Sequence, residues 1–197
     1  MTRPWPEPSS ADLLEAATRY LSRYAASEAA LVRVLERRIA RWQRTADGRP
    51  TDIAAQAAAA RAAIPAILAR LRDAGALDDA SFAAARVRRL ARSGRSRRVI
   101  EAHLAARGVA GDVRQQAIAE NATDDVVSAV LTARRRRLGP FRSEAGSESS
   151  LEKEMAALAR AGFPEGIVRQ VMRLSRAEAD LIVEQASEAR AQDACAE

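Results

Sequence analysis

The sequence has almost none of the residues that carry metal, redox and nucleophilic chemistry. It contains one cysteine, Cys195, and one histidine, His103, in 197 residues. A single cysteine in a polar tail can neither form an internal disulfide nor help to build a metal site. The sequence has no glycine-rich phosphate loop and no paired-carboxylate motif. We therefore expect a protein that is not an enzyme and that needs neither a cofactor nor a metal.

Two features resemble catalytic groups but have simpler interpretations. His103 shares a predicted helical face with Val99 and Ile100, which favours a packed structural histidine over a catalytic one without partners. Asp78 and Asp79 stand at the start of a predicted helix, where capping and the helix dipole favour carboxylates. We expect the histidine to be packed and the two aspartates to cap.

Aromatic residues and long hydrophobic runs are also scarce. Aromatics make up only 4% of the chain and are scattered, whereas single-strand nucleic-acid binders usually offer aromatic platforms. This disfavours direct reading of bases, and we expect Phe82 and Phe163 to be core anchors. No hydrophobic run reaches the length of a membrane span, and the first eight residues have no apolar export stretch. We expect a cytoplasmic protein with no membrane partner.

What the sequence does contain favours helix throughout. Alanine, leucine, arginine and glutamate dominate, and no alternating β pattern of useful length occurs, so the predicted fold class is all-α. Serines such as Ser27 and Ser96 are typical helix starts, and Gly94, Gly108 and Gly162 are typical stops. The predicted helices span 10–24, 27–43, 54–74, 79–92, 96–107, 111–121, 124–138, 149–161, 164–174 and 176–193.

Parts of the chain resemble one another at fixed offsets. The segment HLAARGV at 103–109 matches ALARAGF at 157–163 at an offset of 54, and Ser27 matches Ser96 at an offset of 69. Repeated helical units leave apolar faces that only their neighbours can cover, so we predict tandem three-helix units in an elongated, curved array. The predicted units are 10–74, 78–121 and 123–174, followed by an extra C-terminal helix and tail at 175–197.

The first predicted unit carries an insert. The offset between the first two units falls from 69 to 46 at Ile67, which matches Val113, so about 23 extra residues lie near 42–63. The second half of the insert is almost all alanine. It is either a helical extension that ends at Ile64 and Pro65, where proline forces a break, or a tract that serves only as a spacer.

Positive charge gathers in the middle of the chain. Between residues 86 and 137 thirteen arginines stand against five acids, which gives +8 in a chain whose total charge is +6. Such an imbalance predicts binding of a polyanion or of an acidic protein surface. The candidate residues are Arg86, Arg88, Arg89, Arg92, Arg95, Arg97 and Arg98, and a second block of Arg134, Arg135, Arg136 and Arg137.

Simpler readings of these arginines remain open. Cations at the end of a helix interact favourably with its dipole, and arginine here largely takes the place of lysine, since Lys153 is the only lysine. Four consecutive arginines point all round a helix, however, so the dipole cannot require every member of the second block.

Two segments together resemble the RecX family of bacterial regulatory proteins. One is LRDAGALDDASFA at 71–83, of which 77–82 is the most specific part, and the other is SGRSRRVIEAHLAARGV at 93–109. Between them runs an arginine-rich helix, as in the family pattern of leucine helix, acidic turn, basic helix and glycine turn. The resemblance covers about 13–172 and implies three three-helix units.

The resemblance also implies a function. Members of the family bind the RecA recombinase, insert along the groove of the RecA filament on DNA and suppress its ATPase, strand-exchange and co-protease activities. On this reading the arginines contact the RecA filament or DNA phosphates, and we expect the protein to act as a monomer. Two alternatives are a stand-alone DNA-binding protein with helix-turn-helix units and a helical scaffold for another partner.

Overall fold

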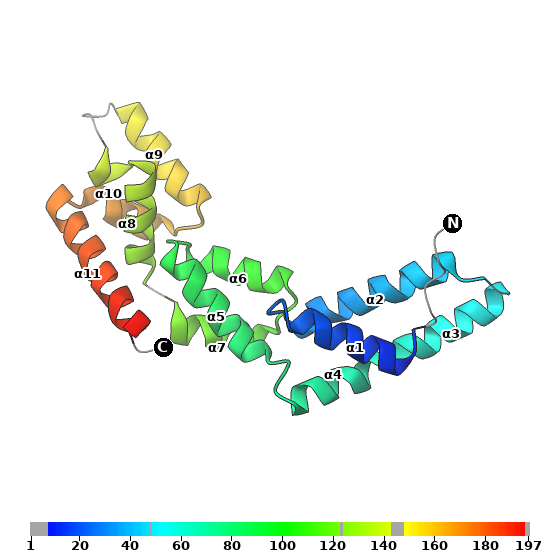
Figure 1. The fold of residues 1–197 in the computed structure, drawn as a ribbon. Coiled ribbons are helices and arrows are strands. Elements are labelled where there is room, and N and C mark those ends of the chain that lie inside the picture. Colours follow the sequence, from blue (N-terminus) through cyan, green and yellow to red (C-terminus); the bar gives the residue numbers. More distant parts are fainter. Residues whose placement is uncertain (1–7, 48, 123, 143–147, 196–197) are drawn as a thin grey trace. The chain divides into compact units, whose positions relative to one another are not determined.

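The structure, a computed structural model, describes residues 8–47, 49–122, 124–142 and 148–195 (Figure 1). Within these ranges every regular element is helical and there is no strand, which confirms the all-α prediction. The elongated, curved arrangement stays a prediction. The elements are α1 (Ser10–Leu21), α2 (Glu28–Thr45), α3 (Pro50–Ala62), α4 (Ile64–Asp73), α5 (Asp79–Arg92), α6 (Arg97–Ala106), α7 (Gly111–Asn121), α8 (Asp125–Arg136), the 3-10 helix η1 (Gly139–Phe141), α9 (Glu148–Arg160), α10 (Glu165–Arg173) and α11 (Arg176–Cys195).

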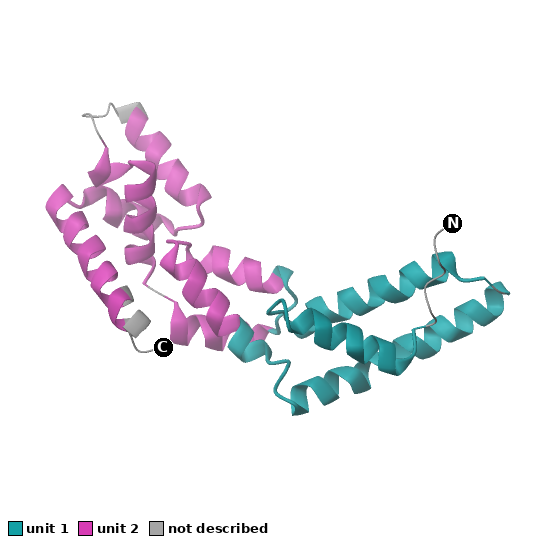
Figure 2. Ribbon diagram, in the orientation of Figure 1, with its two compact units in different colours: residues 1–82, 106–110 teal, residues 83–105, 111–197 magenta. Residues whose placement is uncertain are grey.

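The chain folds into two compact units (Figure 2). The first compact unit contains the chain up to residue 82 together with 106–110, and the second contains 83–105 together with 111 onward. The division into three-helix units at 10–74, 78–121 and 123–174 stays a prediction. All eleven candidate arginines belong to the second compact unit.

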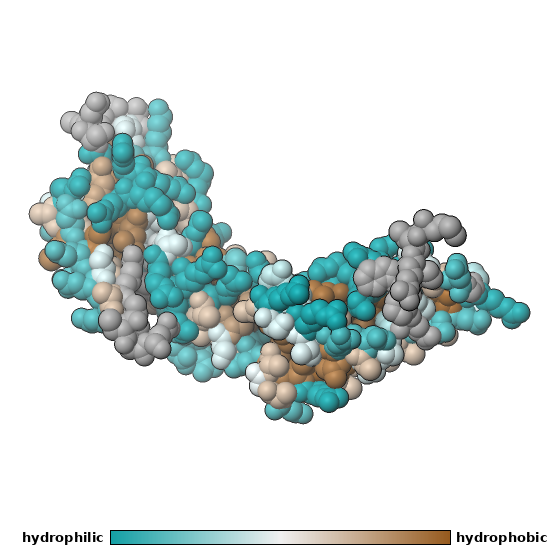
Figure 3. Space-filling view, in the orientation of Figure 1, coloured by the Kyte–Doolittle hydropathy of each residue, from teal (hydrophilic) through white to brown (hydrophobic). Residues whose placement is uncertain are grey.

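The core of the first compact unit forms where α1, α2, α3 and α4 pack together. Leu31, Leu35 and Ile39 recur every four residues along one face of α2 and are fully buried, as expected for an amphipathic helix. Leu13 of α1 and Leu71 of α4 join them from the neighbouring helices. Figure 3 shows apolar side chains of this unit gathered over α1 and α4 between hydrophilic surfaces.

The alanine-rich insert packs into this core. It forms α3, whose Ala57 is fully buried and whose Ala60 is 6% exposed in the same cluster as Trp42. Arg61 of α3 reaches α2, where its Nε lies 3.0 Å from a carboxylate oxygen of Glu36. The interpretation of the alanine tract as a spacer alone is therefore wrong, because small side chains allow α3 to approach α2 closely.

The structure breaks the predicted helix 54–74 into α3 and α4 at Ala63, just before Pro65. By length and composition alone, the described stretch Pro50–Asp73 could cross a bilayer, with a mean hydropathy of 1.2. The alanines of α3 raise this average, and the core helices of a globular unit meet the same criterion of length and composition. Its bulkiest apolar residues, such as Ile67 and Leu68 of α4, are buried in the core of the first compact unit.

The core of the second compact unit gathers residues from α8, η1, α9, α10 and α11. Phe163 is 4% exposed, which confirms its role as a core anchor, and Phe82 of the first compact unit is 7% exposed. The 3-10 helix η1 is not predicted from the sequence. At its start the N–H of Gly139 donates to the buried carboxylate of Glu154 at 2.7 Å, and the same carboxylate pairs with Arg142 at 3.2 Å.

Ser27, the residue before α2, joins two segments that are far apart in the sequence. Its fully buried Oγ accepts a hydrogen bond from the N–H of Ala30 and donates to the carbonyl of Arg107 at 2.6 Å. Beside it, the carboxylate of Asp79 accepts from the N–H of Glu28 at 2.8 Å. Gly108 follows, with φ +79°. We call this group the first serine junction: Ser27, Asp79, Arg107 and Gly108.

The two aspartates of the acid pair cap different helices. Asp78 caps its own helix α5, because its carboxylate accepts from the N–H groups of Ala80 and Ser81. The hydroxyl of Ser81 also donates to it at 2.6 Å, and this hydrogen bond lowers the pKa of Asp78. Asp79 instead caps α2, by accepting from Glu28. The prediction that both aspartates cap a helix is therefore confirmed. Asp78 caps its own helix α5, whereas Asp79 caps α2 and not the helix that it begins.

An equivalent group lies in the second compact unit. The Oγ of Ser96 donates to the carbonyl of Ala161 at 3.0 Å, and the carboxylate of Asp125 accepts from the N–H of Arg97 at 3.0 Å. Gly162 follows Ala161, with φ +89°. Ser96 lies 69 residues after Ser27, Asp125 lies 46 after Asp79, and Gly162 lies 54 after Gly108. These are the offsets at which the sequence repeats. We call this group the second serine junction: Ser96, Asp125, Ala161 and Gly162.

Candidate functional site

The first block of candidate arginines follows α5, the turn after it and the start of α6. Arg86 and Arg88 are half-buried on α5, and the other five are exposed. Within the described chain none of these five exposed arginines forms an ion pair with a carboxylate, and none of their side chains donates a hydrogen bond to the protein. They are Arg89, Arg92, Arg95, Arg97 and Arg98.

Arg88 has a structural contact that the sequence does not predict. Its guanidinium donates to the side-chain oxygen of Asn121 at 2.9 Å, and the amide of Asn121 donates to the carbonyl of Ala117 at 3.0 Å. This chain of hydrogen bonds ties α5 to α7. Arg86 is also half-buried and takes part in contacts of its own. These two arginines are therefore less available to a partner than the five exposed ones.

The second arginine block packs against the turn of the first. Arg134, Arg135, Arg136 and Arg137 are all exposed at the end of α8. The guanidinium of Arg135 donates to the carbonyl of Ser93 at 2.7 Å, and the hydroxyl of Thr132 donates to the carbonyl of Gly94 at 2.6 Å. The structure thus brings the two predicted blocks together around the turn between α5 and α6.

Gly94 is needed for this close approach. It has φ +71°, a region that side chains disfavour, and it is buried against α8. A Cβ at this position would lie 3.0 Å from the hydroxyl of Thr132 and 3.2 Å from the Cβ of Leu131. The residues that hold the two blocks together are therefore Gly94, Thr132 and Arg135. The sequence indicates Arg135 as a candidate contact and Gly94 only as a helix stop, and it does not indicate Thr132.

Arg137 ends α8 in a left-handed conformation, with φ 55° and ψ 47°. Among the described residues it is the one non-glycine residue with positive φ. Its N–H donates to the carbonyls of Ala133 and Arg134, in the manner of a helix C-terminal cap. Arg136, beside it, donates to the carbonyl of Ala157 at 3.4 Å.

The exposed guanidinium groups of the two blocks are chemically suited to bind anions. A guanidinium offers several N–H donors in a planar fork that matches carboxylate and phosphate oxygens. We call this set the central arginine surface: Arg89, Arg92, Arg95, Arg97, Arg98, Arg134, Arg136 and Arg137.

His103 is half-buried on α6, as predicted. Further arginines lie on α1 and α2, outside residues 86–137, where the sequence gathers its positive charge.

The fold and its sequence pattern place the chain in a class of all-α proteins with three-helix domains. Residues 78–118 match a family model described as "RecX, second three-helix domain". "Regulatory protein RecX" of Myxococcus xanthus (strain DK1622) is 39% identical over 164 residues, which cover 81% of this chain and 83% of that protein. This chain belongs to the RecX family, which confirms the resemblance drawn from its sequence.

Other comparisons agree with this assignment. "Regulatory protein RecX" of Agrobacterium fabrum (strain C58 / ATCC 33970) is 40% identical over 111 residues, which cover 56% of this chain and 59% of that protein. The crystal structure of RecX from Lactobacillus salivarius matches with a TM-score of 0.63 at 20% identity, over 87% of this chain and 97% of that one. The likeness to the crystal structure supports the fold.

Proposed function

We propose that this chain inhibits the RecA recombinase by binding along the groove of the RecA–DNA filament. In this role it suppresses the ATPase, strand-exchange and co-protease activities of RecA by binding, without catalysing a reaction. Membership of the RecX family supports the proposal, since relatives carry the name regulatory protein RecX. The protein acts as a monomer in the cytoplasm, where RecA assembles on DNA.

The observation that carries the proposal is the set of exposed arginines on α5, on α6 and in the turn between them, which form no ion pair with any acid of the described chain. Gathering like charges on one surface is unfavourable in the isolated protein, and an anionic partner relieves the repulsion. The groove of a nucleoprotein filament offers both acidic side chains and phosphates. Contacts of this kind weaken as salt screens them, so inhibition should weaken at high ionic strength.

The experiment is a titration of the DNA-dependent ATPase of RecA with the wild-type chain and a charge-reversed variant. The variant is Arg92→Glu/Arg95→Glu/Arg98→Glu, since these side chains are exposed and form no hydrogen bond or ion pair within the described protein. The wild-type chain should inhibit, and the variant should need at least about tenfold more protein, because several charge-assisted contacts become repulsive. Circular dichroism should show the same helicity for both.

A matched control separates position from net charge. Arg44→Glu/Arg49→Glu/Arg70→Glu changes the net charge equally, at exposed arginines of the first compact unit. It should inhibit like the wild-type chain. Equal inhibition by all three proteins would overturn the assignment of the arginines, and no inhibition by the wild-type chain would overturn the proposed function. Tight, salt-sensitive binding of duplex DNA without RecA would instead favour a stand-alone DNA-binding protein.

A further inference from the structure

A second arginine-rich site lies in the first compact unit, in a cavity of about 360 Å³ between α1 and α2. The floor is apolar and includes Ala16 and Val34. Arg37 and Arg41 lie four residues apart on α2 and therefore share one face of that helix, while Arg23 follows α1 in the turn after it. The five arginines that line it are Arg19, Arg23, Arg37, Arg38 and Arg41.

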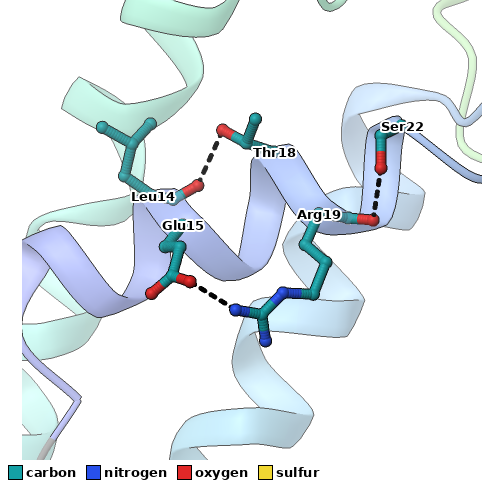
Figure 4. Close-up of polar contacts among 5 residues, drawn as sticks. All are labelled: Leu14, Glu15, Thr18, Arg19 and Ser22. Atoms are coloured by element: carbon teal, nitrogen blue, oxygen red, sulfur yellow. Dashed lines mark hydrogen bonds and ion pairs between the residues drawn. The ribbon is translucent and has the colours of Figure 1, made fainter.

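Among the residues that the structure describes, no acid lines this cavity. The nearest acid on α1 is Glu15, which pairs with Arg19 one helical turn away (Figure 4). The pKa of Asp12 is lowered mainly by its hydrogen bond with Ser9, and the positive charge of Arg38 also lowers it. Arg38 and Arg41 take part in further interactions, whereas the side chains of Arg23 and Arg37 form no hydrogen bond or ion pair within the described chain, so these two supply the unpaired positive charge at the cavity.

Two tyrosines stand at the same cavity. Tyr20 is half-buried on α1, and Tyr24 follows in the turn after α1, with 57% of its surface exposed. Their ring centroids are 5.2 Å apart and the rings are tilted by 41°. Within the described chain only Leu181 is a comparably exposed large hydrophobic residue. Tyr20 therefore holds the ring of Tyr24 at the surface, beside the arginines.

Two side-chain hydroxyls donate to backbone carbonyls along the second half of α1, towards its tyrosine-bearing end. The hydroxyl of Thr18 donates to the carbonyl of Leu14, and that of Ser22 donates to the carbonyl of Arg19, each at 3.0 Å (Figure 4). Ser22 thus satisfies a carbonyl at the end of α1, where the helix leaves such groups without a partner. The ring of Tyr24 is held just beyond a capped end.

We propose that this cavity binds a segment of single-stranded nucleic acid. One unpaired base stacks on Tyr24, and the arginines bind the phosphates on either side of it. Stacking on an exposed ring needs a base whose face is free, which a duplex does not offer. An acidic peptide would satisfy the arginines but would leave the exposed tyrosine pair without a role. We call this site the tyrosine–arginine pocket.

The test measures the binding of a fluorescently labelled oligothymidine strand by anisotropy, without RecA. Tyr24→Ala should weaken binding about 5- to 150-fold, the range typical for loss of one stacked base. Tyr24→Phe keeps the ring and should bind within about twofold of the wild-type chain. Arg23→Ala and Arg37→Ala should each lower the slope of log affinity against log salt by about 0.7, the value for one phosphate contact on a single strand.

Leu181→Ala and Arg44→Ala are the matched controls, since both remove an exposed side chain of similar size outside the pocket. Both should bind the strand like the wild-type chain. Equal binding by Tyr24→Ala and Tyr24→Phe would overturn the proposal. Equal displacement of the labelled strand by polyglutamate and by unlabelled oligothymidine would also overturn it, because the pocket would then accept any polyanion.

The result is independent of the proposed function, because RecA is absent from the assay. The variants are also expected to fold, since Tyr24, Arg23 and Arg37 are exposed. Loss of strand binding in Tyr24→Ala with intact inhibition of the RecA ATPase would assign the pocket and the central arginine surface to separate contacts.

Discussion

The two serine junctions share their hydrogen bonds and differ in the charges around them. In the first, the residues beside Ser27 include Ala26, Glu28 and Ala29, and Glu28 pairs with Arg72 at 3.2 Å. The second junction has arginine at all three of these positions, namely Arg95, Arg97 and Arg98. Because the same hydrogen bonds form with either set, the junction does not require arginine. These side chains are thus free to serve a partner, which is what the proposed function needs.

The sharpest test of this comparison exchanges the charges of one junction for those of the other. Arg95→Ala/Arg97→Glu/Arg98→Ala gives the second junction the residues of the first. We expect inhibition of the RecA ATPase to fall at least about tenfold. The free energy of unfolding should change by no more than about 0.5 kcal/mol, as for other surface changes. A large loss of stability in urea unfolding would show that the arginines hold the junction.

The glycines should be the most sensitive positions for stability in both junctions. A Cβ on Gly108 would lie 2.4 Å from the Cβ of Ala29, and one on Gly162 would lie 2.6 Å from the Oγ of Ser96. Each alanine variant should lose about 2–4 kcal/mol, from backbone strain and overpacking together. Gly75→Ala is the control, since it has φ +67° with no atom within 4 Å of the added Cβ. It should lose only about 1–2 kcal/mol in urea unfolding.

Removing a junction hydroxyl should have a smaller effect, of similar size in both units. Ser27→Ala and Ser96→Ala each lose a helix cap and a hydrogen bond to a distant carbonyl, which should cost about 1–2 kcal/mol. Ser22 and Ser93 are exposed and their hydroxyls bond only within their own turns, so their alanine variants should lose less than about 0.5 kcal/mol. Thermal unfolding of all four variants tests whether the junctions are equivalent.

The smallest expected difference is in acid sensitivity. The hydroxyl of Ser81 lowers the pKa of Asp78 from its ordinary value of 3.8, and Val127 takes the place of Ser81 beside the second junction. A lowered pKa adds stability above the unfolded value and loses it as the pH falls through the folded value. Below pH 4 the wild-type chain should lose stability more steeply than Asp78→Asn. Parallel curves for the two proteins in urea unfolding at pH 2–6 would contradict this.

Most helices could be predicted because their starts and stops are local. Ser27 and Ser96 cap helices through groups three residues away, and glycine ends a helix through its own φ. The partners of the same groups could not be predicted. The hydroxyl of Ser27 also donates to a carbonyl 80 residues further along, and Asp79 caps a helix 51 residues earlier. Such contacts depend on packing, which a local pattern does not contain.

The candidate site shows the same division. A count of charges finds the arginines of the central arginine surface, because they are close in sequence and nearby acids are few. It does not reveal that Arg88 is tied to Asn121, nor that Arg135 reaches the turn at Ser93. The tyrosine–arginine pocket is missed for the opposite reason. Its arginines come from α2 and from α1 with the turn after it, and each segment alone has the charge pattern of an ordinary solvated surface.

The left-handed backbone of Arg137 has a consequence for how this protein could evolve. Glycine would adopt that conformation with about 1 kcal/mol less strain. An arginine at this position therefore lowers the stability of the fold while it adds a positive charge. Laboratory selection for thermostability alone should therefore replace Arg137 with glycine. If the charge serves the filament, a selection that also demands control of RecA in living cells should retain it.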